Sequence, residues 1–219
     1  HGDTPPQHCA TAWSEQLDHI VTEVSAGNWF GTIASEPGAN GDLLASRAHA
    51  KQVGPGNQWL MTGDKFMGSG SGITSFMLTV AKPEGAEVPD VFLIDARGQS
   101  WDGSTGVCMV REWDGVGMAA TQSHAFRFDD APVTRYGWAD YALSLAPTIL
   151  PFINAMFSAV ALGILDNTMA AARVALHKRN ERIKALERTL WVKAENQYWL
   201  AEQALAGMIL AVEKGDDAL

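Results

Sequence analysis

The fold is decided by two stretches of sequence, FGTIASEPGANGDLLASRAHA at residues 30–50 and WLMTGDKFMGSGSGITSFMLTVA at residues 59–81. Both contain short runs of β-branched, aromatic and aliphatic residues that are interrupted by Gly, Pro, Asn and Asp. This punctuation is typical of strands joined by turns. No long helical pattern separates the two stretches, so they predict strands of one β-domain.

Similar runs extend this pattern from Trp29 to about Val133. Their spacing predicts an antiparallel barrel or sandwich of about 100 residues. On its N-terminal side, residues 14–26 predict a helix with Ser14 as the N-cap. After Asp140 the chain is predicted to be helical to its end, with the last helix at about 181–214. The predicted strands are residues 29–35, 58–63, 75–81, 91–96, 106–112 and 123–129.

Composition limits the classes of protein that the chain can belong to. It has 219 residues, of which 47% are hydrophobic and 19% charged, so a sizeable core is expected and disorder is not. The net charge of -9 argues against a nucleic-acid binder. Residues 1–130 hold 7 basic and 16 acidic side chains, whereas residues 131–219 hold 9 of each. Cys9 and Cys108 form no disulfide or metal-binding pattern, which favours a reducing cytoplasm.

One stretch is long enough to span a membrane. Residues 141–165 contain no formally charged side chain. Pro147 and Pro151 weaken its first half as a continuous helix, and Asn154 would be costly in lipid. We therefore expect a helix buried between protein layers or subunits, and no membrane association.

Four segments follow one another in a fixed order. They are SEPGANGD at 35–42, GDKFMGSG at 63–70, VFLID at 91–95 and GVGMAATQSHAFRFDDAPV at 115–133. Together they resemble the acyl-CoA dehydrogenase superfamily, whose β-domain carries TEPGxGSD, GxKxWITN and GxRxSxTxxxxFxDVxVP segments. The resemblance covers about residues 14–176 well and the last helix loosely.

The resemblance implies an α+β, acyl-CoA dehydrogenase-like fold. It places the end of an N-terminal helical domain at residues 1–28 and a middle antiparallel β-barrel domain, the flavin platform, at residues 29–134. An incomplete C-terminal helical bundle follows at residues 135–219. The chain then lacks parts of a complete family member, so a fragment and a naturally shortened member both stay open.

The resemblance also implies a flavin cofactor, FAD with FMN as the alternative. Backbone groups of Ile33 and Ala34 and the Ser35 hydroxyl would bind the pyrimidine edge of the flavin. Ser69 would lie on the side of flavin atom N5, and Met67 stands where a Trp commonly packs on the ring. The complete implied set is Ile33, Ala34, Ser35, Gly41, Met67, Gly68 and Ser69.

The departures from the family pattern concern catalysis. Gly41 replaces a serine, so one hydroxyl is lost. Acyl-CoA dehydrogenation needs a carboxylate base, but no Glu occurs between Asp114 and Asn180. Ile153 lies near the turn where some members carry that Glu. The sequence therefore names no catalytic base.

Three functions stay open at this stage. The first is a flavin-dependent oxidoreductase that transfers hydride from a CH–CH substrate, such as an acyl thioester, to FAD. The second is a monooxygenase that uses reduced flavin and oxygen, and the third is a non-catalytic flavin-binding or assembly module. His49 and His124 are predicted to be structural. We expect a homodimer or homotetramer that binds a small molecule such as an acyl-CoA, without metal or nucleic acid.

Overall fold

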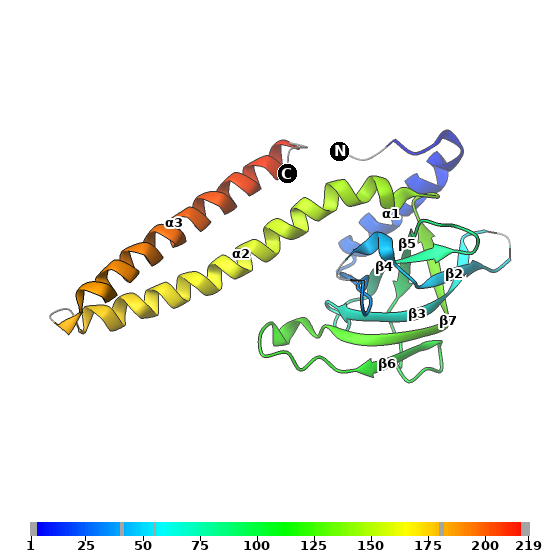
Figure 1. Cartoon of the computed structure of the whole chain (residues 1–219). Coiled ribbons are helices and arrows are strands. Elements are labelled where there is room, and N and C mark those ends of the chain that lie inside the picture. The colour runs from blue at the N-terminus through cyan, green and yellow to red at the C-terminus, as the bar shows by residue number, and fades with distance from the viewer. Residues whose placement is uncertain (1–3, 40–41, 55, 180–181, 216–219) are drawn as a thin grey trace. The chain divides into compact units, whose positions relative to one another are not determined.

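The computed structural model describes residues 4–39, 42–54, 56–179 and 182–215. The chain divides into two compact units, His1–Leu145 and Ala146–Leu219, and α2 crosses this boundary. The three-domain division at residues 28 and 134 stays a prediction. In chain order the elements are η1 (Gln7–Cys9), α1 (Ala10–Ser25), β1 (Phe30–Thr32), η2 (Leu43–Ala45), β2 (His49–Gln52), β3 (Gln58–Gly68), β4 (Phe76–Pro83), β5 (Asp90–Asp95), β6 (Val107–Arg111), η3 (Ala119–Thr121), β7 (His124–Tyr136), α2 (Tyr141–His177) and α3 (Ala185–Lys214) (Figure 1).

The strands close into a barrel, as predicted. The order β4–β2–β3–β7–β5 returns to β4 because β5 also pairs with β4. β1 lies beside the start of β4 at Phe76, and β2 lies beside its end at Pro83. Both of these pairings are parallel, whereas the other strand pairings are antiparallel as predicted.

Two clusters of buried side chains hold the first unit together. The larger one contains Met61, Phe92 and Phe126, all at most 1% exposed. The second contains Phe76 and other residues of β4, β5 and β7, with Ile20 of α1 packed against it. Burial of large aromatic side chains is the main source of stability in such cores, so the barrel and α1 form one self-supporting unit.

Several strand and helix boundaries differ from those predicted. β2, with the sequence HAKQ, was not expected, because only Ala50 is buried and no apolar alternation marks it. β3 and β7 continue beyond residues 63 and 129. α1 begins at Ala10, so Ser14 is not its N-cap, and α3 begins at Ala185. Residue 181, where the last helix was predicted to begin, lies outside the described residues.

α2 is continuous through Pro147 and Pro151, which were expected to weaken its first half as a continuous helix. Each proline removes only one backbone N–H from the helix, and both lie in its first three turns. Among the described residues, α2 is also the one helix long and apolar enough to cross a membrane. Core helices of other proteins pass the same test, so this is weak evidence for a span. Only 6% of the most apolar 18-residue stretch of α2 is buried. The contacts within this chain therefore do not provide the burial between protein layers that the sequence predicted.

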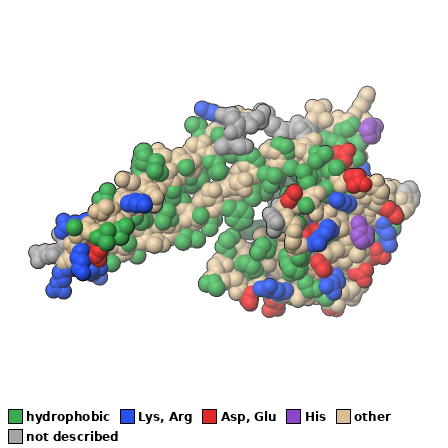
Figure 2. Space-filling model, in the orientation of Figure 1, with side chains coloured by type: hydrophobic (Ala, Val, Ile, Leu, Met, Phe, Trp, Pro, Cys, Tyr) green, Lys and Arg blue, Asp and Glu red, His purple; other side chains and the backbone are tan. Residues whose placement is uncertain are grey.

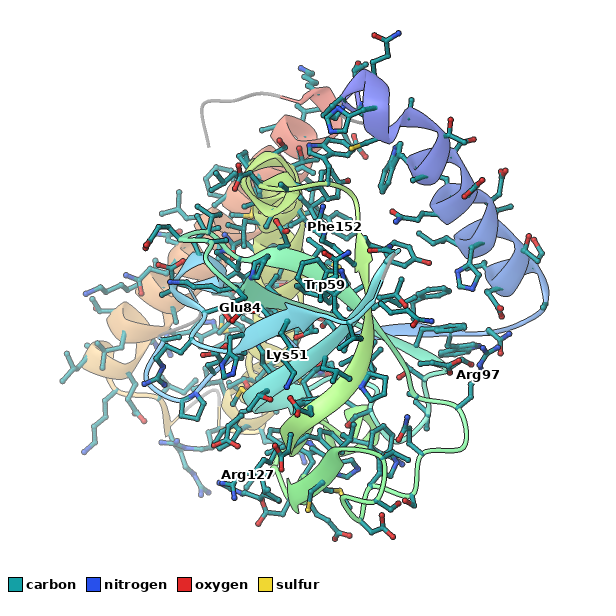
Figure 3. The ribbon with its side chains drawn as sticks, turned by 90° about the vertical axis from the view of Figure 1, so that its right-hand side faces the viewer. Lys51, Trp59, Glu84, Arg97, Arg127 and Phe152 are labelled. Atoms are coloured by element: carbon teal, nitrogen blue, oxygen red, sulfur yellow. The ribbon has the colours of Figure 1, made fainter. Side chains whose placement is uncertain are left out.

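Charged and apolar side chains are distributed differently in the two units. Figure 2 shows acidic and basic side chains mixed over the barrel and hydrophobic ones along the helices. Lys51 and Arg127 lie on the outside of barrel strands, where each pairs with an acid (Figure 3). The described residues of α3 include none that is buried. The barrel therefore has a closed interior, whereas the helices expose much of their apolar surface.

Candidate functional site

Residues 33–35 and 66–69, which the resemblance assigns to a flavin and which we call the flavin segments, lie side by side in the barrel unit. Isolated bridges join Thr32 to Ser69 and Ser35 to Phe66. The backbone N–H of Phe66 donates to the carbonyl oxygen of Ser35 at 2.8 Å. The fold thus brings together two segments that are about 30 residues apart in the sequence, as the resemblance implies.

Two hydrogen-bond donors in the first segment have no acceptor among the described residues. They are the hydroxyl of Ser35 and the backbone N–H of Ala34, and both residues are half-buried. Ile33 differs, since its N–H donates to the Leu78 carbonyl at 2.8 Å and its carbonyl accepts from Thr79 Oγ1 at 2.6 Å. Its side chain is completely buried. Ile33 therefore anchors the segment to the barrel core, and Ala34 and Ser35 carry the two donors that can bind a ligand.

The second segment contains a bulge where its pairing with β7 shifts register between Lys65 and Gly68. Met67 has φ 56°, in the left-handed region, and its side chain is 61% exposed. Gly68 packs against Ile33, because a Cβ there would lie 2.7 Å from Ile33 Cδ1. The bulge thus turns the Met67 thioether outward, where it can contact a ligand.

Ser69 is exposed, and its hydroxyl oxygen lies 3.3 Å from that of buried Ser123. This places Ser69 next to the segment that leads into β7. Gly41, the remaining residue of the implied flavin set, lies outside the described residues.

A buried ion pair fixes both flavin segments. Lys65 Nζ lies 2.7 Å from Glu36 Oε1, and the two side chains are 0% and 4% exposed. The same ammonium donates to the Val80 carbonyl at 2.6 Å. Glu36 also accepts from Ser46 Oγ at 2.5 Å and from the Arg47 N–H at 2.7 Å. Buried charges are tolerated when their hydrogen bonds are satisfied in this way.

The environment of the pair changes the pKa of both groups. Burial by itself would raise the pKa of Glu36, but the hydrogen bonds from Lys65, Ser46 and Arg47 outweigh it and lower this pKa to about 2. Burial lowers the pKa of Lys65, and the Glu36 carboxylate opposes that shift. Glu36 follows Ser35 directly and Lys65 precedes Phe66, so the pair holds the two flavin segments in register.

Both residues of this pair lie in the motifs SEPGANGD and GDKFMGSG, but the motifs alone indicated no role for them. The signal that was available is a lysine inside a strand that is otherwise largely apolar on its inward face. Lys65 is fully buried on the same strand as buried Trp59 and Met61. A lysine at such a position requires a counter-ion. The sequence did not identify Glu36 as that partner.

The histidines and cysteines suggest no chemistry of their own. His124 Nδ1 accepts from the backbone N–H of Trp113 at 2.9 Å, which fits a structural role. His49 is exposed on β2. Cys9 and Cys108 are free thiols. The described residues contain no cluster of His, Cys, Asp or Glu that could hold a metal.

A catalytic carboxylate remains unassigned. Asp166 is the single acidic residue within α2, and it accepts a hydrogen bond from the Tyr198 hydroxyl at 3.0 Å. The nearby Glu202 carboxylate, partial desolvation and the Asp166 carboxylate raise the pKa of Tyr198 to about 12. An exposed acid held in this way has no feature of a general base. Asp166 is therefore not a candidate for the catalytic base that the sequence also left unassigned.

Two surface pockets lie away from the flavin segments. One, of about 380 Å³, lies between α1 and the barrel and includes His19 and Arg97. The other, of about 360 Å³, lies where α2 meets α3 and includes His177 and Trp191. Neither pocket contains Ser35 or Ser69. Within the flavin segments Met67 and Ser69 are exposed, so the second segment is accessible from the surface of the barrel.

The donors on these segments fit a flavin. Its pyrimidine edge offers carbonyl oxygens and ring nitrogens, which match the unpartnered Ser35 hydroxyl and Ala34 N–H. The exposed Met67 side chain fits a contact with an aromatic ring. These three groups belong to two segments that the buried ion pair holds together.

No family model matches the chain. Among curated proteins, the mitochondrial long-chain specific acyl-CoA dehydrogenase of Sus scrofa is 28% identical over 137 residues, which are 59% of this chain and 30% of that protein. Among solved structures, an acyl-CoA dehydrogenase from Slackia heliotrinireducens has a TM-score of 0.70 and 17% identity, covering 93% of this chain and 52% of that one.

Two further solved structures contain ligands. KijD3, in complex with FMN and a dTDP-linked amino keto sugar, has a TM-score of 0.69 and 20% identity and covers all of this chain and 51% of KijD3. Glutaryl-coenzyme A dehydrogenase in complex with glutaryl-CoA has a TM-score of 0.64 and 19% identity, covering 88% of this chain and 51% of that one. Proteins of this fold therefore bind small-molecule substrates of differing chemistry.

These likenesses show the class of fold: a β-barrel domain combined with C-terminal helices, as in acyl-CoA dehydrogenases. Together with the curated relative, they bear out the resemblance to acyl-CoA dehydrogenases that the four sequence motifs predicted. The chain spans about half the length of these solved structures and matches under a third of the curated relative.

Proposed function

We propose that the chain binds a flavin on residues 33–35 and 66–69 and is the cofactor-binding part of an oxidoreductase of acyl-CoA dehydrogenase type. The observation that carries the proposal is the pair of unpartnered donors, Ser35 Oγ and Ala34 N–H, on a segment fixed by the buried Glu36–Lys65 pair. Bound FAD, or FMN as the alternative, would supply the hydride acceptor for a CH–CH substrate such as an acyl thioester.

Each residue of the proposed site has a separate task. Ser35 and Ala34 donate to the pyrimidine edge and so orient the ring. Met67 packs on the ring face, and Ser69 lies on the side of N5. Gly68 has no side chain, so the second segment can pack closely against Ile33 of the first segment. These residues bind and orient, and none of them removes a substrate proton.

A monooxygenase that uses reduced flavin and oxygen is the second candidate. One observation favours it: α2 contains no Glu that could act as the dehydrogenase base. A non-catalytic flavin-binding or assembly module is the third candidate. It is supported by α2, which supplies no Glu that could act as a catalytic base.

The first test is flavin binding by the purified chain. We expect titration with FAD and FMN to give a bound flavin with shifted visible absorbance, and Ser35→Ala to weaken binding by about fivefold because one hydrogen bond is lost. Ser100→Ala, at a hydroxyl bonded to Asp102 in another loop, is the matched control and should bind as the parent does. A parent chain that binds neither flavin would contradict the proposal.

The reaction separates the candidates. Reduction of bound flavin by an acyl-CoA under anaerobic conditions supports the dehydrogenase. Oxygen transfer to an organic substrate by the chain with reduced flavin supports the monooxygenase. Flavin binding with neither activity, measured on a chain extended to the full reading frame, supports the non-catalytic module.

We further propose that the chain acts in the cytoplasm as a homodimer or homotetramer. Large apolar side chains such as Phe152 and Phe157 on α2 and Trp199 on α3 are more than half exposed. Such surfaces are usually covered in an assembly. Sedimentation should give the mass of two or four chains, and Phe157→Gln should lower it; a monodisperse monomer would contradict the assembly.

A further inference from the structure

Three hydroxyl groups connect the flavin segments to the loop before β7. Ser69 Oγ lies 3.3 Å from Ser123 Oγ, and Ser123 Oγ lies 2.7 Å from Thr121 Oγ1. Thr121 Oγ1 lies 2.8 Å from the carbonyl oxygen of Met118. We call Ser69, Ser123 and Thr121 the hydroxyl chain.

The last contact sets the direction of every hydrogen in this chain. A carbonyl oxygen only accepts, so the single hydrogen of the Thr121 hydroxyl points to Met118. Thr121 Oγ1 must then accept from Ser123, which uses the single hydrogen of Ser123. Ser123 Oγ in turn can only accept from Ser69. The Ser69 hydrogen therefore points inward, and its lone pairs face outward.

The end of the hydroxyl chain is held firmly. The Met118 carbonyl also accepts from Trp113 Nε1 at 3.1 Å. Met118 and Gln122, on either side of η3, both have positive φ, at 55° and 45°. Left-handed backbone at two such residues is costly and persists only where neighbouring contacts enforce it.

Contacts with the residues directly after the second flavin segment help to enforce this backbone conformation. The Gly70 N–H donates to the Thr121 carbonyl at 2.7 Å, and Ser71 Oγ donates to the Gln122 carbonyl at 2.7 Å. Ser123 itself is 9% exposed, so its hydroxyl depends on protein partners. The loop that carries Thr121 and Ser123 is thus fastened to the residues that follow Ser69.

We propose that Ser123 and Thr121 are positioning residues that make Ser69 a hydrogen-bond acceptor and so favour the reduced form of a bound flavin. This inference rests on the proposed flavin site. N5 of an oxidised flavin accepts a hydrogen bond, whereas N5 of a reduced flavin carries a hydrogen and donates one. A Ser69 hydroxyl that donates to Ser123 can accept from the reduced form, whereas donating to the oxidised form would break its bond to Ser123.

The test compares the affinities of the full 219-residue chain for oxidised and for anaerobically reduced FMN and FAD. We expect Ser123→Ala to release the Ser69 hydrogen and to lower the ratio of the oxidised to the reduced dissociation constant by about fivefold. At 29.6 mV per decade for a two-electron couple, the midpoint potential of the bound flavin falls by about 20 mV.

Two Thr121 variants test the direction of the chain. Thr121→Val removes the hydroxyl but keeps the branched shape, so it should lower the ratio as Ser123→Ala does. Thr121→Ser keeps the hydroxyl and should retain the parent's ratio. Thermal unfolding of each variant shows whether the barrel has kept its stability, and Ser100→Ala serves as the distant control.

A double-mutant cycle separates orientation from a general structural effect. In a Ser69→Ala background there is no hydroxyl left to orient, so adding Ser123→Ala should leave the ratio unchanged. An unchanged ratio in the single Ser123→Ala variant, or an equal change in both backgrounds, would overturn the inference while leaving the proposed flavin site intact. A parent chain that binds no flavin would overturn both.

Discussion

The barrel unit and the helical unit handle their charged and apolar side chains in opposite ways. In the barrel, Lys65 and Glu36 form an ion pair that is almost completely buried, inside a closed cluster of apolar side chains. In the helical unit, Arg173 and Glu195 form a pair whose side chains are 43% and 33% exposed. Apolar residues such as Phe157 and Trp199 are exposed there as well.

This difference shows which part of the chain is complete in itself. The barrel buries its large apolar side chains, and it provides hydrogen-bond partners for the buried charges of Lys65 and Glu36. α3 has no buried residue, so its apolar positions must gain their stability from another surface. Stability of the flavin segments should therefore depend on the barrel, and little on charges in the helices.

The largest expected effect comes from breaking the buried pair. Lys65→Met leaves the Glu36 carboxylate without its counter-ion in the interior, so we expect the free energy of unfolding to fall by about 3–5 kcal/mol. Denaturant unfolding followed by tryptophan fluorescence measures this loss.

Lys51→Met is the matched control, because Lys51 forms an exposed pair with Asp130 at 2.9 Å. It should cost about 1 kcal/mol or less. Adding Glu36→Gln to Lys65→Met should recover part of the loss, since no charge then stays buried. Equal losses in the Lys65 and Lys51 variants would show that the barrel does not depend on the buried pair.

Acid pH should weaken the same pair more gradually. The pKa of Glu36 is lowered from 4.5 to about 2 in the fold, so its contribution to stability is fully present above pH 4.5 and is lost as the pH falls towards 2. The stability advantage of the parent chain over Glu36→Gln should therefore shrink across this interval. An advantage that stays constant down to pH 2 would contradict the assigned pairing.

The smallest effect is expected in the helical unit. Arg173 donates to both oxygens of Glu195, at 2.9 and 2.7 Å, but the pair is in contact with solvent. Arg173→Gln should leave the unfolding midpoint of the barrel at the parent's value, because exposed pairs are screened by water and salt. A shift as large as that of Lys65→Met would remove the distinction between the two units.

Local patterns were enough to predict most of the fold. Runs such as SFMLTVA and VFLIDA became β4 and β5 within one or two residues, because alternation and β-branched content act within the strand itself. β2 was missed because a strand with one buried residue has almost no pattern. Parallel pairing was missed because it depends on which distant strand lies at the same edge of β4.

The candidate site divides in the same way. Motif order placed Ser35, Met67 and Ser69 as flavin-binding candidates, and the structure brings their segments together. The sequence did not reveal that both backbone groups of Ile33 are already bonded. Nor did it reveal the contact between Ser69 and Ser123, because these residues are 54 positions apart.

The sequence by itself determined the resemblance to acyl-CoA dehydrogenases, the β-domain between two helical regions, and the residues that we propose to face a flavin. These follow from local propensity and from the order of short motifs, which need no knowledge of distant contacts. Tertiary structure alone decided the buried contact between Lys65 and Glu36 and the contacts of the hydroxyl chain. In both cases each donor hydrogen needs a nearby acceptor, and folding brings that acceptor close from a distant part of the sequence.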